Sequence, residues 1–255
     1  MRASRSTTLY LLSELVKRDF RSRFAGSALG LTWAILQPLS LVTLYWFVFT
    51  FMIPSGRGLT PDEYPLFLIS GLLPWIGFSE GITRSATSLT DNSQMVRKLT
   101  FRSEILVIVP NVSAILFQLI GIALFMLFLL VKGRLGAQTL LLPAAVLLQL
   151  IIQVGAGWIV AGMNVLLRDV GQVVGFSLSF LFYLSPILYV VSQRWASVFA
   201  WNPLTPLLGL FRSALIGAAL PPTGSLVFLL VVAATCFFAG LSFFRRLQPV
   251  LADLI

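Results

Sequence analysis

The sequence predicts an all-α, polytopic membrane protein with six transmembrane helices, and three observations carry that prediction. Of its 255 residues, 58% are hydrophobic and only 11% are charged, whereas soluble domains carry about 25% charged residues. Apolar runs recur along the whole chain, and each is long enough for a hydrocarbon core of about 30 Å. Most basic residues lie beside alternate connections between these runs, which is the pattern that orients membrane helices.

The six apolar runs are separated by polar or Gly/Pro-rich segments, so residues 1–255 form a single transmembrane domain. The second run is interrupted by Gly71 and Pro74, and a broken helix of this kind is tolerated only against protein or a water-filled cavity. Near its end, Glu80 stands four residues before Arg84, a spacing that allows an ion pair. The expected spans are residues 31–53, 65–82, 105–131, 139–167, 172–191 and 225–244.

Three further segments do not fit a span. Residues 7–25 predict an amphipathic helix that lies in the membrane interface, serving as a topogenic anchor or guiding an anionic lipid head. Residues 84–104 form a long polar run that cannot sit in hydrocarbon, because each central charge costs several kcal/mol there. Residues 192–222 hold four prolines among apolar side chains, so we expect short helices that dip partway into the outer leaflet.

The basic residues set the expected orientation. With the N terminus inside, 13 of the 18 Lys and Arg residues fall on the cytosolic side, in agreement with the positive-inside rule. Six spans then place both termini and residues 84–104 in the cytosol. The net charge of +9 therefore indicates anionic lipid headgroups as partners rather than nucleic acid.

Several classes of chemistry are excluded by the residues present. The chain contains no histidine, no phosphate-binding G-x-x-x-x-G-K-[ST] loop and no metal-ligand or Ser/His/Asp pattern. Ion-coupled carriers need buried carboxylates for their relays, and Glu80 is the nearest candidate to a span. The sequence therefore favours a permease that is driven by a separate motor protein, with no cofactor in this chain.

Aromatic and small residues give weaker signals. Rings stack on sugars, so Tyr45, Trp46 and Trp75 are candidates for lining a glycan channel, although such rings more often face lipid or pack in a core. Small residues at four-residue spacing allow close helix contacts and are candidates for a subunit interface. These pairs are Gly26/Gly30, Gly77/Gly81, Gly157/Ala161 and Gly171/Gly175.

Several sequence motifs, spread over essentially the whole chain, together resemble those of one protein family. The string RDFRSRFAGSALGLTWAILQPL (18–39) is similar to the N-terminal signature of type-2 ABC exporter permeases for bacterial surface polysaccharides. Residues 64–101 look like the second span and coupling segment of that family. LRDV (167–170), SPILY (185–189) and WNPLTPLLGLFRSAL (201–215) look like its later landmarks.

The resemblance implies a homodimer in the bacterial inner membrane, paired with two copies of an ATPase subunit that holds ATP and Mg²⁺. The implied cargo is a lipid-pyrophosphate-linked O-antigen, a capsular glycan or teichoic acid. Residues implied to couple to the ATPase are Asp91, Gln94, Met95, Val96, Arg97, Lys98, Leu99 and Phe101. Arginines expected to attract the head group are Arg18, Arg21, Arg23 and Arg84. Residues assigned to a periplasmic gate are Trp201, Asn202, Pro203 and Arg212.

Two alternatives remain open at the level of the sequence. A permease for a small drug or a lipid would share the architecture, but its site would be a closed apolar cavity rather than a continuous channel. A membrane-embedded enzyme or scaffold would need a catalytic cluster or a large soluble face, and the sequence contains neither.

Overall fold

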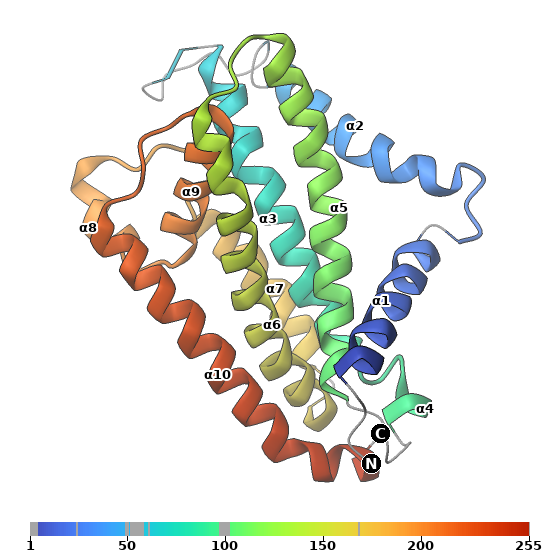
Figure 1. Ribbon diagram of the computed structural model, residues 1–255. Helices are drawn as coiled ribbons and strands as arrows, with labels where there is room; N and C mark the ends of the chain where they lie inside the picture. The colour runs from blue at the N-terminus through green and yellow to red at the C-terminus, as the bar shows by residue number, and fades with distance from the viewer. Residues whose placement is uncertain are drawn as a thin grey trace.

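A computed structural model describes residues 5–23, 25–48, 51, 59–60, 62–96, 103–167 and 169–254. Within these ranges the chain is built from helices and connecting turns, without a β-strand, as the all-α prediction requires (Figure 1). The long helices are α3 (Glu63–Thr87), α5 (Glu104–Val131), α6 (Leu142–Leu166) and α10 (Thr223–Leu254). The shorter elements are α1 (Arg5–Ser22), η1 (Gly30–Thr32), α2 (Trp33–Phe47), α4 (Ser93–Val96), η3 (Ala137–Leu141), α7 (Val170–Leu184), η4 (Gln193–Trp195), α8 (Ala196–Phe199) and α9 (Leu204–Ile216).

Helices α3, α5 and α6 pack side by side and form the centre of the bundle (Figure 1). Their buried side chains, such as Ile69, Phe78, Ile122 and Ile152, form one continuous apolar core with residues from α7 and α9. Because α3 contacts neighbours on several sides, its glycines and Pro74 lie against protein, as the broken second run predicts.

Helix α10 crosses the outer face of α6 at close range. A Cβ atom added to Gly155 would stand 2.5 Å from the Cys236 carbonyl oxygen, and one added to Gly240 would overlap the Gly155 carbonyl. Small residues therefore bring the two backbones together. Gly77, Gly81 and Gly157 likewise face side chains within the same chain, so these positions serve contacts inside the protomer rather than the subunit interface that their spacing indicated.

Within the described residues, four helical segments are long and apolar enough to cross a membrane: Glu63–Thr87, Glu104–Val131, Ala137–Leu166 and Thr223–Pro249. The first and fifth expected spans correspond to α2 and α7, which are shorter apolar helices of 15 residues each. Helix α7 ends at Leu184 rather than at residue 191, because Pro186 follows and restricts Ser185 to the extended backbone it adopts (φ −103°, ψ 143°).

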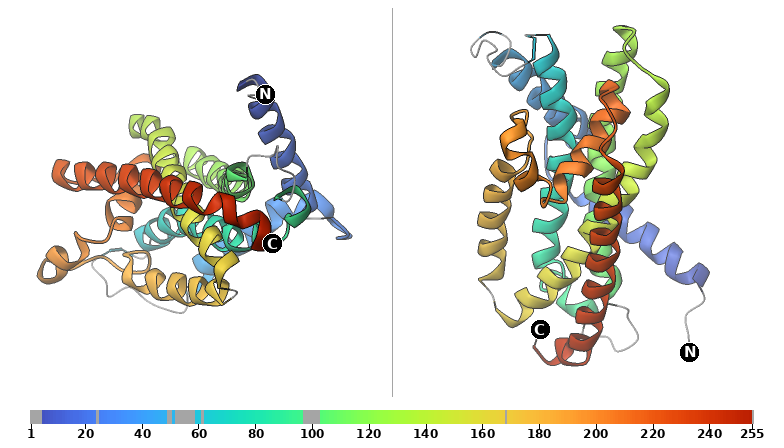
Figure 2. Two further views of the ribbon diagram at one scale, coloured as in Figure 1. Left: turned by 90° about the horizontal axis from the view of Figure 1, so that it is seen from below. Right: turned by 90° about the vertical axis from the view of Figure 1, so that its left-hand side faces the viewer.

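Helix α1 is amphipathic, as the sequence predicts. It also packs against the bundle, however, and so is not confined to the membrane interface. Its apolar side, including Val16, packs against Ile105 and Val109 of α5, while Lys17, Arg18 and Arg21 are exposed. The start of α1, the helix α4 and the end of α10 all lie at one end of the bundle, here called the polar end (Figures 1 and 2).

Candidate functional site

The polar run at residues 84–104 is shorter in the structure than in the sequence, because both flanking helices extend into it. Helix α3 continues to Thr87 and α5 begins at Glu104, so Arg84 is a helical residue. Between them, residues 88–92 turn and α4 follows at Ser93–Val96. The segment 88–96 is called the strap below. Residues 97–102 lie outside the described residues, and with them the expected coupling residues Arg97, Lys98, Leu99 and Phe101.

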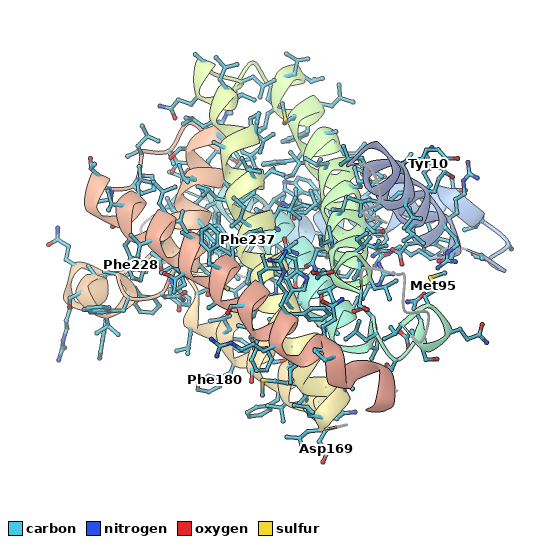
Figure 3. All side chains as sticks on the ribbon, turned by 60° about the horizontal axis from the view of Figure 1, so that its bottom comes forward. Tyr10, Met95, Asp169, Phe180, Phe228 and Phe237 are labelled. Carbon is cyan, nitrogen blue, oxygen red and sulfur yellow. The ribbon has the colours of Figure 1, made fainter. Side chains whose placement is uncertain are left out.

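Two apolar side chains fasten the strap to the bundle. Leu89 is fully buried and Val96 is 5% exposed, and both belong to one apolar cluster with Val107 of α5, Trp158 of α6 and Phe244 of α10. Asp91 and Gln94 point to the surface, and Met95 is half-buried at the edge of the molecule (Figure 3). The strap therefore presents a polar outer face while its inner face touches three helices at once.

An ion-pair cluster joins α1 to α3 beside the strap. Arg23 lies 2.6 Å from Glu80, Arg84 lies 2.6 Å from Asp19, and Arg84 also stands 3.6 Å from Glu80. The last contact is the pair that the four-residue spacing predicted. The four side chains are 16–31% exposed, so solvent and salt screen them less than surface pairs.

This cluster shows that the four arginines expected to attract the head group have different surroundings. Arg23 and Arg84 are each paired with carboxylates, and the Arg23 guanidinium also lies 3.9 Å from the centre of the Phe117 ring. Arg18 and Arg21 are exposed, and Arg18 donates a 3.4 Å hydrogen bond to Asn92 of the strap. The arginines thus divide into two that hold α1 against α3 and two that face outward.

Buried amides form a polar network in the centre of the bundle, and the sequence analysis missed it. Gln118 of α5 and Gln149 of α6 exchange hydrogen bonds of 3.0 and 2.7 Å, and Gln149 also donates to the Pro74 carbonyl at 3.2 Å. One turn further, Gln153 donates to the Gly77 carbonyl at 2.8 Å. Asn111 of α5 makes a separate buried hydrogen bond to Ser85 Oγ at 2.8 Å. The available signal was the presence of amides inside apolar runs, with Gln149 and Gln153 four residues apart.

Two of the three expected channel residues lie on α2 and the third lies in the core. Trp46 is 44% exposed, and Tyr45 is half-buried beside the apolar core. Trp75 is 9% exposed and packs against Phe78 and Phe182, with ring centres 6.0 and 5.5 Å apart. Trp75 therefore lies inside the protomer, away from the surface that a channel wall requires.

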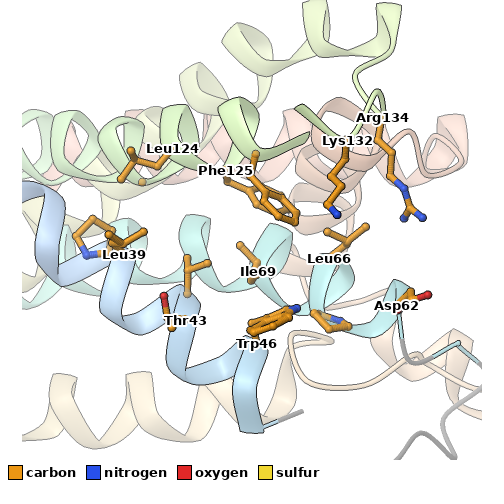
Figure 4. Close-up of a pocket in the computed structure, with 15 residues that line it drawn as sticks. Leu39, Thr43, Trp46, Asp62, Leu66, Ile69, Leu124, Phe125, Lys132 and Arg134 are labelled. Atoms are coloured by element: carbon orange, nitrogen blue, oxygen red, sulfur yellow. The ribbon is translucent and has the colours of Figure 1, made fainter. Parts of the chain in front are cut away.

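Trp46 borders a groove of about 590 Å³ between α2, α3 and α5 (Figure 4). The groove is lined by apolar side chains such as Leu66, Ile69 and Phe125. Its charged residues are Asp62, Lys132 and Arg134, which lie together at the end of the groove that is farther from the strap. The lining suits an alkyl chain better than a sugar because most of it carries no hydrogen-bonding group.

The expected gate region folds into η4, α8 and α9, as the prediction of short helices requires. Trp201 is 79% exposed, whereas Asn202 donates to the Leu184 carbonyl at 3.0 Å and accepts from the Leu204 N–H at 2.9 Å. Pro203 precedes the first residue of α9. Arg212 is 8% exposed, so this expected gate residue is buried on α9.

Comparison with known proteins identifies the family to which this chain is similar. The model of the ABC-2 type transporter family matches residues 10–216. The chain is 29% identical to the O-antigen export system permease protein RfbA of Myxococcus xanthus, covering 96% of this chain and 95% of that protein. It is 26% identical to a protein of the same name from Klebsiella pneumoniae, covering 96% and 95%. The polysialic acid transport protein KpsM of Escherichia coli is 26% identical, covering 93% of both chains. Because the family model spans most of its length, this chain belongs to the ABC-2 type transporter family.

Proposed function

We propose that this chain is the transmembrane subunit of an ATP-driven exporter that moves a lipid-pyrophosphate-linked polysaccharide, of the O-antigen class, across the bacterial inner membrane. The observation that carries the proposal is the similarity over nearly the full chain to permeases named for O-antigen export and polysialic acid transport. The fold supports a transport role, because the described residues form a membrane bundle whose hydrophilic strap is fixed at one end.

The proposed topology has six crossings with both termini in the cytosol. Helices α2 and α7 supply the two crossings beyond the four long helices. An even number of crossings is supported by the start of α1 and the end of α10, which lie at the same end of the bundle (Figure 2). The same end holds the strap, so the polar end faces the cytosol, in keeping with the excess of basic residues there.

The strap is the proposed contact with a separate ATPase subunit, which binds ATP and Mg²⁺. Asp91, Gln94 and Met95 supply the surface that the ATPase would press upon. Leu89 and Val96 then pass the displacement to α5, α6 and α10, whose side chains enclose them. Protein interiors are close-packed, so a push on a buried side chain moves its neighbours instead of being absorbed.

Two copies of the chain, each with one ATPase, would form the exporter, and the polysaccharide would pass along the seam between them. Helix α7 offers such a seam an exposed apolar face, with Phe176, Phe180 and Tyr183 at 75%, 61% and 68% exposure; Phe180 is labelled in Figure 3. Arg18 and Arg21 are the exposed cations at the cytosolic mouth that would attract the pyrophosphate, while Arg23 and Arg84 position α1 beside it.

The proposal is tested by complementing a strain from which the gene has been deleted. We expect the wild-type chain to restore surface polysaccharide and to stimulate ATP hydrolysis by its ATPase. The variant Arg97→Glu with Lys98→Glu should reduce both by about tenfold or more, because it reverses two charges that directly follow the strap in the chain, at positions expected to couple to the ATPase. The matched control, Lys132→Glu with Arg134→Glu, makes the same charge change at the opposite end. Equal export and equal ATPase stimulation by wild type and the first variant, at equal membrane levels, would overturn the coupling role.

A further inference from the structure

A second cavity, of about 320 Å³, lies open beside α9, the turn after α7 and the start of α10. Most of its wall is apolar, with Phe67, Val190 and Leu220 among the lining residues. Three residues on α9, Thr205, Gly209 and Arg212, follow each other at steps of four and three and so share the helix face that borders the cavity.

Arg212 is a buried cation without a carboxylate partner. Its Nη2 donates to the carbonyl oxygens of Pro186 at 2.6 Å and Ile187 at 3.4 Å, and its guanidinium lies 3.6 Å from the centre of the Phe67 ring. None of the ion pairs among the described residues involves it, and no acidic residue lines the cavity. Burying a charge without a counter-ion costs several kcal/mol, and only carbonyl oxygens and an aromatic ring offset that cost here among the described residues.

Two hydrogen-bonding atoms beside this cavity also lack partners. Arg212 Nε and Thr205 Oγ1 are both buried without a hydrogen bond in the part of the chain that the structure describes. A purely structural arginine that clamps the turn after α7 needs only the Nη2 bonds. The guanidinium also depends on a glycine at position 71 for its space, because a Cβ atom there would stand only 2.8 Å from Arg212 Nη2.

The start of α9 adds to the positive character of this cavity. Thr205 and Pro206 lie in the first turn of a 13-residue helix, where the helix dipole favours negative charge. The Leu204 N–H is capped by Asn202, which holds this helix end in place. Arg212 and the helix end are thus two separate sources of positive potential that border one cavity.

We propose that this cavity is an anion site, and that its ligand is a phosphate or diphosphate group bound by the Arg212 guanidinium and the Thr205 hydroxyl. Guanidinium groups recognise phosphate oxygens through paired N–H donors, and the threonine hydroxyl supplies a further donor. The group could belong to a lipid diphosphate or to a free phosphate compound. The site does not depend on the proposed export function, but in that function it would receive the diphosphate at the end opposite the strap.

The site is tested on the purified full-length chain in phosphatidylcholine nanodiscs, without an ATPase. Thermal unfolding is followed with sodium pyrophosphate, with farnesyl diphosphate, and with sodium chloride at matched ionic strength. We expect a saturating diphosphate to raise Tm by about 3–8 °C over the chloride control. A response to both diphosphates indicates a site for the phosphate group alone, and a response only to farnesyl diphosphate indicates a lipid head-group site.

Three variants separate this site from general attraction to cations. Thr205→Val keeps the shape of the side chain and should weaken diphosphate binding about tenfold, the effect of one hydrogen bond. Arg212→Lys keeps the charge but loses the planar fork, and should abolish the Tm response. Arg194→Gln removes an exposed arginine that does not line the cavity and should respond like wild type. If Arg212→Lys fails to fold, Thr205→Val decides. No Tm response to either diphosphate, or equal affinities in wild type and Thr205→Val, would overturn the proposal.

Discussion

Arg84 Nη2 lies 2.6 Å from Asp19 Oδ1, although 65 positions separate these residues in the chain. Through this contact and the neighbouring Arg23–Glu80 pair, α1 is held against the end of α3 from which the strap departs. Arg18 reaches the strap itself through Asn92. Helix α1, the end of α3 and the strap are therefore one connected unit, and displacement of the strap should be accompanied by displacement of α1.

The coupling between Asp19 and Arg84 is measurable by a double-mutant cycle. Each side chain is partly exposed, at 21% and 31%, so we expect a coupling free energy of about 0.5–1 kcal/mol in detergent-solubilised protein. The variants are Asp19→Ala, Arg84→Ala and their combination, compared by reversible denaturant unfolding. Arg21→Ala, which removes an exposed arginine of the same helix, should show no coupling with Asp19→Ala. Additive effects of Asp19→Ala and Arg84→Ala would show that the pair contributes nothing.

The Gln118–Gln149 pair should behave as a unit. Gln118→Leu leaves the buried Gln149 amide short of a partner, and hydrogen bonds of this kind between membrane helices contribute about 0.6–1.7 kcal/mol. The double variant, with Gln149→Leu, should destabilise the protein by less than the sum of the single variants. Gln172→Leu on the exposed face of α7 serves as the control and should have little effect. A double variant that costs at least the sum of both singles contradicts this interpretation.

Replacing Gly240 should separate α10 from α6. An added Cβ atom would meet backbone atoms of Gly155, and backbone atoms in two packed helices cannot move aside as a flexible side chain can. We expect Gly240→Ala to destabilise the protein by about 1–3 kcal/mol, measured as a lower Tm. Gly224→Ala in the same helix has open space around it and should leave Tm unchanged or slightly raised. Similar melting of both variants would mean that the close approach is unimportant.

The proposed orientation predicts opposite labelling of the two ends. In a chain whose single cysteine is removed by Cys236→Ala, Met95→Cys should react with a membrane-impermeant maleimide only after cells are opened. Lys132→Cys, at an exposed position in the turn after α5 at the opposite end of the bundle (Figure 1), should react in intact cells with a permeabilised outer membrane. Reaction of the Met95→Cys variant in those cells would place the strap on the wrong side for an ATPase.

The four long apolar helices and their order along the chain could be predicted from the sequence, because hydrophobic periodicity and run length show which segments avoid water. Their exact ends could not, since a local effect decides each one. Pro186 stops α7 seven residues before the apolar run ends. Helix α3 extends past residue 82, the expected end of the second span, because Arg84 finds Asp19 and Glu80 as partners.

The candidate site was predictable only in its local features. The Glu80–Arg84 pair is found because it depends on spacing within one helix. Gln118 with Gln149, and Arg212 with the Pro186 carbonyl, join residues 31 and 26 positions apart, and composition says nothing of such pairing. The same limit explains Trp75, whose burial depends on Phe182 of another helix.

The most direct test of the central claim, that the strap receives the push of an ATPase, is site-specific cross-linking from the exposed residue Gln94. In the Cys236→Ala background, Gln94→Cys is fitted with a short photoreactive group in membranes that contain the companion ATPase. We predict a covalent adduct with the ATPase from this position, with an ATP-dependent yield, and none from Trp201→Cys. An adduct from Trp201→Cys, or no adduct from Gln94→Cys while export continues, would contradict the account.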